Sequence, residues 1–312
     1  MIQLLTDSAA DLTAQELQAL QITVIPLGVH FGADAYLDGR TLDRPTFYRL
    51  LQSSAVFPTT SQPSPADFES CFSAARAKGD DVVAVLLSSA LSGTFQGACI
   101  AREMMDPEDA THIHLVDSLS ATVGERFLLL HAAALRDRGA SAAEIAAELT
   151  ELRRRITIWA SVDTLEYLCK GGRLSRTAAG VGSLAKVKPI ITLTREGRVA
   201  VQKKCIGKSR CMSEITALTE KRRPDPSHPV LACTASMRTT AAHWPDGWQR
   251  AVSPLLRITI WKSAPLSAPT LVPMPTAWPI LPQTNKDAHH REPCSGIAGT
   301  RLCVFFCSSA QI

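Results

Sequence analysis

Short apolar segments alternate with amphipathic segments along residues 1–155. The apolar segments predict strands at 2–5, 22–29, 82–87 and 112–116. Several are followed by a helix start signal, such as Thr13 with Glu16 three residues later, which fits a capping box. Strands and helices that alternate through short links predict an α/β fold, with a mostly parallel sheet covered by helices on both faces.

Local patterns also predict a hairpin and two capped helices within this first unit. Residues 29–31 are expected to face 35–37 across a turn-rich link. Asp43 is expected to cap a helix that has Pro45 in its first turn. Ser64 followed by Pro65 fits the start of the next helix, to about residue 77.

A second, smaller α/β domain is expected to begin at residue 156. Strands are predicted at 156–160, 190–193 and 198–202, the last two joined by a turn at Glu196 and Gly197. The predicted domains are therefore 1–155 and 156–221. The second domain is incomplete on this interpretation, because the strands that should finish it do not follow.

The composition changes after Lys221. Residues 222–312 hold 12 of the 19 prolines, 4 of the 5 tryptophans and 4 of the 9 cysteines, and no helical or strand period persists there. One interpretation is a proline-rich tail. The interpretation that we favour is a shifted reading frame, because tryptophan and cysteine are uncommon in disordered tails. Both predict that 222–312 is largely disordered, and the second leaves open a damaged, non-functional product.

Composition and charge exclude several classes of protein. The chain is 46% hydrophobic and 20% charged, which is an ordinary globular balance. Residues 1–221 carry 24 basic and 25 acidic side chains, so no nucleic-acid partner is expected. No apolar run approaches the length of a membrane span, and the start lacks the basic region of a signal peptide. We therefore expect a cytoplasmic protein with reduced cysteines.

Two hydroxyl-rich turns are the candidate binding site. One covers residues 58–65, and the other, 88–94, follows the most apolar predicted strand. Free backbone N–H groups at a helix start beside hydroxyl donors form a ready anion site, and ligands of parallel sheets bind at the carboxyl ends of strands. The alternative is that these residues are helix caps only. The candidate ligand-binding residues are Thr60, Ser61, Ser92, Gly93 and Thr94.

Other motifs carry no function. Residues 180–185 fit the dinucleotide fingerprint but do not follow a strand, and Ser183 with Lys186 matches an acylase spacing without its partner motifs. The histidines and cysteines between 289 and 307 match no common zinc spacing. We therefore expect no metal site, no cofactor and no catalytic residues.

The chain resembles the DegV family over about residues 1–220. The resemblance is carried by segments in the order and spacing of that family, namely 6–12, 60–64, 91–95, 116–118, 170–175 and 186–190. It implies a two-domain α/β protein that binds one long-chain fatty acid such as palmitate. The carboxylate would be held by hydroxyls at the turns matched by Thr60 and Ser92, with Asp7, Ser8 and Arg173 as secondary candidates.

The same resemblance implies a carrier in lipid metabolism. Such proteins present the acyl chain to a separate ATP-dependent fatty-acid kinase and are not themselves enzymes. The chain departs from the family in two places. Ile206 and Gly207 stand where family members often have an Arg-Thr pair, and the tail lacks the family's closing HxGxGAxG turn.

An enzyme is the alternative hypothesis. A phosphotransferase of the α/β class could use the same anion site for phosphate. It would need a metal-binding carboxylate cluster near Ser92, for which Asp7, Asp11 and Asp117 are the candidates. Carboxylates at strand ends are more often caps.

Overall fold

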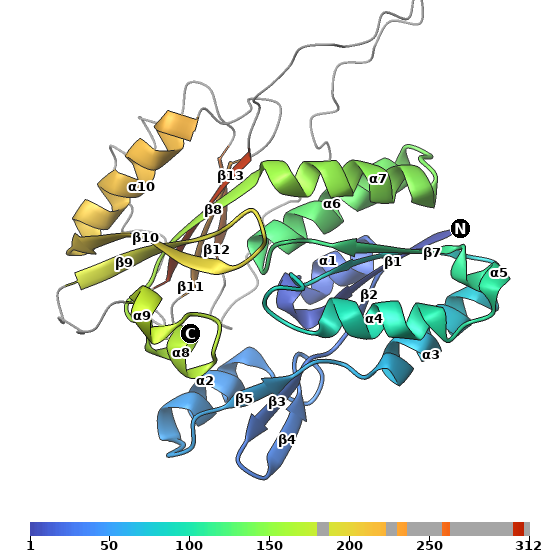
Figure 1. Ribbon diagram of the computed structural model, residues 1–312, viewed down its shortest axis with the longest axis horizontal. Coiled ribbons are helices and arrows are strands. Elements are labelled where there is room, and N and C mark those ends of the chain that lie inside the picture. Colours follow the sequence, from blue (N-terminus) through green and yellow to red (C-terminus); the bar gives the residue numbers. More distant parts are fainter. Residues whose placement is uncertain (180–186, 223–229, 236–257, 263–301, 309–312) are drawn as a thin grey trace, which may run out of the picture.

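The computed structural model describes residues 1–179, 187–222, 230–235, 258–262 and 302–308 (Figure 1). A four-stranded parallel sheet organises the first domain, in the order β2-β1-β6-β7. Its strands are β1 (Ile2–Asp7), β2 (Ile22–Ile25), β6 (Asp81–Leu86) and β7 (Ile113–Asp117). The predicted α/β class and parallel sheet are confirmed.

Helices cover both faces of this sheet (Figure 1). Leu4 and Val83 point to one face, where they pack with α6 (Val123–Asp137) and α7 (Ala142–Leu152). Leu5 and Val82 point to the other face, where they pack with α3 (Pro65–Arg76) and α4 (Thr94–Glu103). Successive strand residues point to opposite faces, so each central strand contributes to two cores. The short elements are η1 (Ser8–Ala10), α1 (Ala14–Ala19), α5 (Pro107–Ala110) and η2 (Arg153–Arg155).

The predicted helix starts are present. Thr13 and Glu16 form a capping box before α1, and Ser64 and Asp67 form another before α3. Asp43 caps α2 (Arg44–Ser53), and its side chain accepts a hydrogen bond from the Thr46 N–H at 2.8 Å. These side chains satisfy backbone donors that a helix leaves free at its first turn.

A small antiparallel sheet lies beside the first domain, in the order β4-β3-β5. The predicted hairpin is confirmed, with β3 (Gly28–Phe31) paired to β4 (Asp34–Leu37). Two expectations are wrong. The predicted strand 22–29 is divided between β2 and β3, which belong to different sheets, and the expected turn at Thr60 is the edge strand β5 (Thr59–Ser61), paired to β3. Thr59 and Thr60 are branched at Cβ, which suits an extended backbone.

The second sheet has the order β10-β9-β8-β13-β11-β12. β8 (Ile156–Ser161) begins at the predicted domain boundary, and the predicted turn at Gly197 joins β9 (Val187–Leu193) to β10 (Val199–Ile206). Its other strands and its helices are β11 (Val230–Ala235), β12 (Ile258–Lys262), β13 (Leu302–Ser308), α8 (Glu166–Lys170), α9 (Arg176–Ala179) and α10 (Lys208–Arg222).

The structure differs from the expectation of a disordered tail at three segments. β11, β12 and β13 pair in parallel, and β13 also pairs with β8, so these residues extend the second sheet. Each segment is a short apolar run that suits a strand, although the tail as a whole shows no period. The frameshift interpretation stays a prediction. The rest of the tail, residues 180–186 and the candidate zinc residues between 289 and 294 lie outside the described residues.

Candidate functional site

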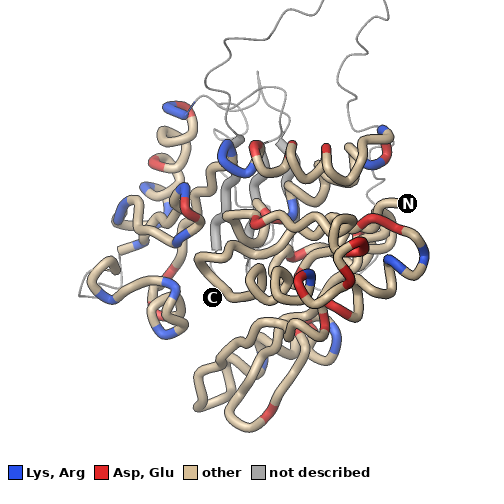
Figure 2. The backbone as a smooth tube through the Cα atoms, turned by 45° about the vertical axis from the view of Figure 1, so that its right-hand side comes forward, with Lys and Arg blue, Asp and Glu red and all other residues tan. Residues whose placement is uncertain are grey.

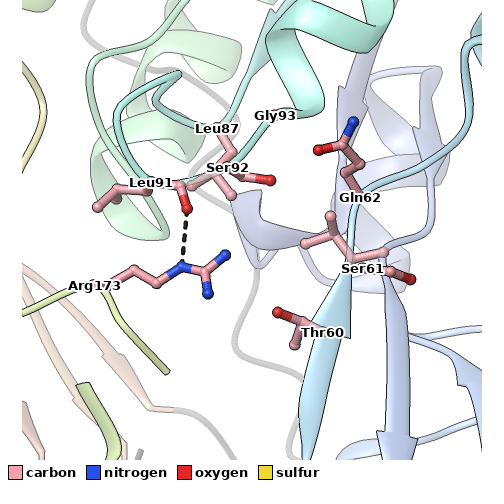
Figure 3. A pocket seen from close by; sticks show the side chains of 9 residues that line it. Thr60, Ser61, Gln62, Leu87, Leu91, Ser92, Gly93 and Arg173 are labelled. Carbon is pink, nitrogen blue, oxygen red and sulfur yellow. Dashed lines mark hydrogen bonds between the residues drawn. The ribbon is translucent and has the colours of Figure 1, made fainter. Parts of the chain in front are cut away.

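A pocket of about 430 Å³ lies where the two domains and the small sheet meet (Figure 3). Its volume is in the range of small-molecule sites. The lining combines aliphatic side chains with hydroxyl, amide and guanidinium groups. The lining residues are Leu27, Thr60, Ser61, Gln62, Leu87, Leu91, Ser92, Gly93 and Arg173.

One side of the pocket is the edge strand β5. Thr60 pairs with Val29 of β3, and its hydroxyl is directed toward the side of the pocket that holds Arg173 (Figure 3). The Ser61 hydroxyl points the other way and forms a 3.0 Å hydrogen bond with His30 Nε2. Strand geometry explains the difference, because neighbouring side chains point to opposite faces. Thr60 thus offers the hydroxyl on this side.

The opposite side is the loop that follows β6, residues 87–93. Ser92 Oγ lies 2.8 Å from Thr94 Oγ1 and accepts a hydrogen bond from the Thr94 N–H at 3.3 Å. Gly93 is the N-cap residue of α4 and makes no side-chain cap of its own, so the Ser92 hydroxyl is the side chain that accepts a first-turn N–H there. A Cβ atom at Gly93 would lie 2.0 Å from Gln62 Oε1, so only glycine lets the Gln62 amide lie against the helix start.

Two carboxylates from neighbouring strands hold this loop. Asp7 at the end of β1 accepts hydrogen bonds from the Leu87 N–H at 2.8 Å and the Ala9 N–H at 2.9 Å. Asp117 at the end of β7 accepts from the Ser89 N–H at 3.1 Å and the Ser89 hydroxyl at 2.6 Å. The loop that carries Ser92 is therefore fixed from both adjacent strands.

The carboxyls beneath the loop have shifted pKa values. Burial raises the pKa of Asp7 to about 6, against the opposing effect of its backbone hydrogen bonds. Burial, with the Asp7 charge second, raises the pKa of Glu125 well above its usual range. The Thr6 hydroxyl donates to Glu125 Oε1 at 3.1 Å, and Glu125 is fully buried on α6. Both carboxyl groups therefore bind a proton more readily in the folded protein than they would in water.

Arg173 reaches the pocket from the second domain. Its Nε donates to the Leu91 carbonyl at 2.9 Å, and its Nη1 donates to the Gly171 carbonyl at 2.5 Å (Figure 3). Both acceptors are neutral carbonyls, so these bonds leave the guanidinium charge uncompensated. The arrangement suits an anion placed among Thr60, Ser92 and Arg173.

The structure brings five of the eight predicted residues into the pocket lining, namely Thr60, Ser61, Ser92, Gly93 and Arg173. The other three support the lining from behind. Thr94 is fully buried beneath Ser92, Asp7 holds the Leu87 N–H, and Ser8 Oγ accepts from the Leu27 N–H at 3.1 Å.

Sequence reasoning did not select Gln62, Leu27, Leu87 and Leu91 as candidates. Gln62 and Leu91 lie inside segments that carry the family resemblance, so their position was a usable signal. Leu27 and Leu87 are ordinary aliphatic residues next to strands, and only the fold brings them to one cavity.

The carboxylates of the enzyme hypothesis have structural partners. Asp7 and Asp117 accept backbone N–H groups, and Asp11 forms an ion pair with Arg44. Within the ranges that the structure describes, no group of three or more metal-ligating side chains is found. Nor does a helix among the described residues have the length and apolar character needed to cross a membrane.

The fold and pocket define a class: an α/β protein whose cavity is lined by aliphatic side chains together with hydroxyl, amide and guanidinium groups. The chain belongs to the DegV family, since the sequence profile of that family, described as one of uncharacterised proteins, matches residues 1–245. A DegV domain-containing protein from Caldanaerobacter subterraneus is 36% identical over 211 residues, which are 68% of this chain and 74% of that protein.

Solved structures of the same fold are described as fatty-acid-binding proteins. DegV from Bacillus subtilis, described as a fatty acid binding protein, matches with a TM-score of 0.68 and 30% identity over 84% of this chain and 92% of that one. A stearic acid-binding protein from Eubacterium ventriosum matches with a TM-score of 0.64 and 26% identity, over 71% of this chain and 76% of that one.

Proposed function

We propose that this protein binds one long-chain fatty acid, such as palmitate, with its carboxylate between Thr60 and Ser92. The observation that carries the proposal is that these two hydroxyls, from separate parts of the chain, line one pocket together with Arg173 and three leucines. The stearic acid named for one structural relative and the fatty-acid binding described for another support the same class of ligand.

The polar and apolar parts of the ligand would contribute differently. Hydrogen bonds to a charged group contribute about 1.5–3 kcal/mol each. Burying some 14 methylenes at about 0.8 kcal/mol each contributes more, before the cost of ordering the chain. The acyl chain therefore supplies most of the affinity, while the hydroxyls and Arg173 decide which end of the ligand lies at this pocket.

We further propose that the protein is a cytoplasmic carrier and not an enzyme, and that it presents the carboxylate to a fatty-acid kinase. Two features support a partner at this site. Arg173 is exposed, so the polar end is accessible from solvent. The charges are also divided between the domains: residues 1–155 carry 12 basic and 20 acidic side chains, and 156–222 carry 13 and 5 (Figure 2). Such a division can orient an incoming protein.

Native mass spectrometry of the purified full-length protein tests the binding proposal. We expect one added mass in the range of a long-chain fatty acid, which is lost on delipidation and restored when palmitate is added. Folded, delipidated protein that takes up neither palmitate nor stearate would contradict the proposal. Addition of ATP, Mg²⁺ and the loaded protein alone, with acyl phosphate as the readout, tests the absence of kinase activity.

A further inference from the structure

The turn between β9 and β10 contacts the binding loop, although it belongs to the second domain. The Ser88 hydroxyl donates a 3.0 Å hydrogen bond to the Gly197 carbonyl, across 109 residues of sequence. Ser88 is fully buried, so water cannot replace the bond without opening the contact. In Figure 1 the tip of this hairpin reaches the end of the first sheet.

Ser88 also holds the conformation of the loop through its hydrogen bonds. Its carbonyl accepts hydrogen bonds from the Leu91 N–H at 2.9 Å and the Ser92 N–H at 3.1 Å, and its own N–H donates to the Ser120 carbonyl at 2.9 Å. Its hydroxyl accepts from the Ala90 N–H at 3.3 Å. The position of Ser88 therefore sets the position of Ser92.

The contact leaves no space at Gly197. A Cβ atom there would lie 2.1 Å from Ser88 Oγ and 3.0 Å from Leu119 Cα. The Leu119 atoms in this contact are backbone atoms of a tight loop in which Leu119 has a positive φ. They cannot move aside as the end of a flexible side chain could. Gly197 itself has φ +75°, which glycine adopts without strain.

We propose that the β9–β10 turn is a positioning element for the carboxylate site and acts through Ser88. This inference rests on the proposed function. It adds that the second domain sets the geometry of Ser92 from a place outside the pocket, in addition to the direct contact of Arg173 with Leu91. Ser88 is a positioning residue, because it holds the loop and does not line the cavity.

The test compares palmitate with its methyl ester, which keeps the acyl chain and lacks the charge. Gly197→Ala inserts a methyl group between the turn and the loop. Gly79→Ala is the matched control, since Gly79 has the same φ of +75° and no atom within 4 Å of the added Cβ. Both variants bear the same backbone strain, and only the first disturbs the contact. Dissociation constants are measured by calorimetry on delipidated full-length protein.

We expect wild type to prefer the acid over the ester by roughly tenfold or more, given the strength of hydrogen bonds to charged groups. Gly197→Ala should weaken palmitate binding by about tenfold and ester binding by less than about threefold. Gly79→Ala should leave both dissociation constants unchanged. Equal weakening of acid and ester, or no weakening of either, overturns the inference. If wild type binds neither ligand, the proposed function fails with it, and that outcome is distinct.

Ser88→Ala provides a second variant that adds no bulk, and it decides the matter if Gly197→Ala does not fold. It removes the hydrogen bond to the Gly197 carbonyl and should also reduce the preference for the acid. A wild-type preference in folded Ser88→Ala protein overturns the inference.

Discussion

The two sides of the pocket are built in opposite ways. The loop of residues 87–93 is fixed by buried groups: Asp7 and Asp117 hold its backbone, and Ser88 bonds to the second domain. Across the pocket, β5 is a three-residue edge strand whose residues are all exposed. One side is thus preorganised, and the other is held by a single strand pairing. Preorganised donors bind a charged group at lower cost, because less freedom is lost when the ligand binds.

The largest effect is expected when the hydroxyl on each side is removed. Ser92→Ala combined with Thr60→Ala should lower palmitate affinity roughly a hundredfold to ten-thousandfold, since two bonds of about 1.5–3 kcal/mol each are lost. The melting temperature should stay within a few degrees, because Thr60 lies on an exposed edge strand and Ser92 accepts only one first-turn N–H of α4, that of Thr94. Calorimetry and thermal unfolding check both values. Loss of stability with normal binding by the folded protein would make both residues merely structural.

The Asp7 carboxyl beneath the loop of residues 87–93 should make the free energy of unfolding depend on pH. Burial raises the Asp7 pKa from 3.8 to about 6, so the folded state binds this proton more tightly than the unfolded chain does. The free energy of unfolding should therefore fall as pH rises from about 4 to 7, by about 3 kcal/mol for Asp7. Glu125 acts in the same direction.

Urea unfolding of wild type and Asp7→Asn across this range provides the measurement. The variant lacks the titrating group, so it should lose part of the slope. Slopes that agree within error would show that burial does not raise the Asp7 pKa in the folded protein.

Two helix caps separate stability from binding. Ser64→Ala and Ser141→Ala each remove a capping box and should each lower the free energy of unfolding by about 0.5–2 kcal/mol. Ser64 lies two residues after Gln62, which lines the pocket next to the exposed strand β5. Ser141 precedes α7, whose residues do not line the pocket. Ser64→Ala should weaken palmitate by up to about threefold and Ser141→Ala not at all. A binding defect in Ser141→Ala would mean that affinity follows global stability.

The smallest effect is expected at Ser61. Its hydroxyl is directed away from the pocket and bonds to His30, so Ser61→Ala should change palmitate affinity by less than about twofold. Thr60→Ala alone, measured in the same titration, is the comparison. A larger defect in Ser61→Ala than in Thr60→Ala would reverse the assignment of the two hydroxyls.

The pattern of the sequence was sufficient for the first domain. Strand ends such as Asp7 and caps such as Ser64 follow local rules, so the alternation of β and α elements and the capping boxes could be predicted. The division of 22–29 into two strands was missed although the sequence carries a signal for it, since Pro26 stands between β2 and β3 and cannot donate to a strand ladder. The three tail strands were missed for a different reason, since each is a short run within a segment that has no period.

The site was predictable only in part. Hydroxyls at strand ends drew attention to Thr60 and Ser92, which the structure brings to one pocket. The residue type does not determine where a side chain points. The sequence therefore could not show that the Ser61 hydroxyl is directed away from the pocket or that Thr94 is buried beneath Ser92. The contact between Ser88 and Gly197 joins residues that are distant in sequence, and no local pattern indicates it.

The central claim, that the carboxylate of one fatty acid lies between Thr60 and Ser92, is tested most directly by NMR of palmitate labelled with ¹³C at its carboxyl carbon. Bound to wild type, it should give one carboxyl resonance shifted from that of free palmitate. With the Thr60→Ala, Ser92→Ala double variant at ligand concentrations that restore binding, that resonance should move or broaden. A bound resonance that is identical in the two proteins would contradict the account, because the carboxylate would then lie elsewhere.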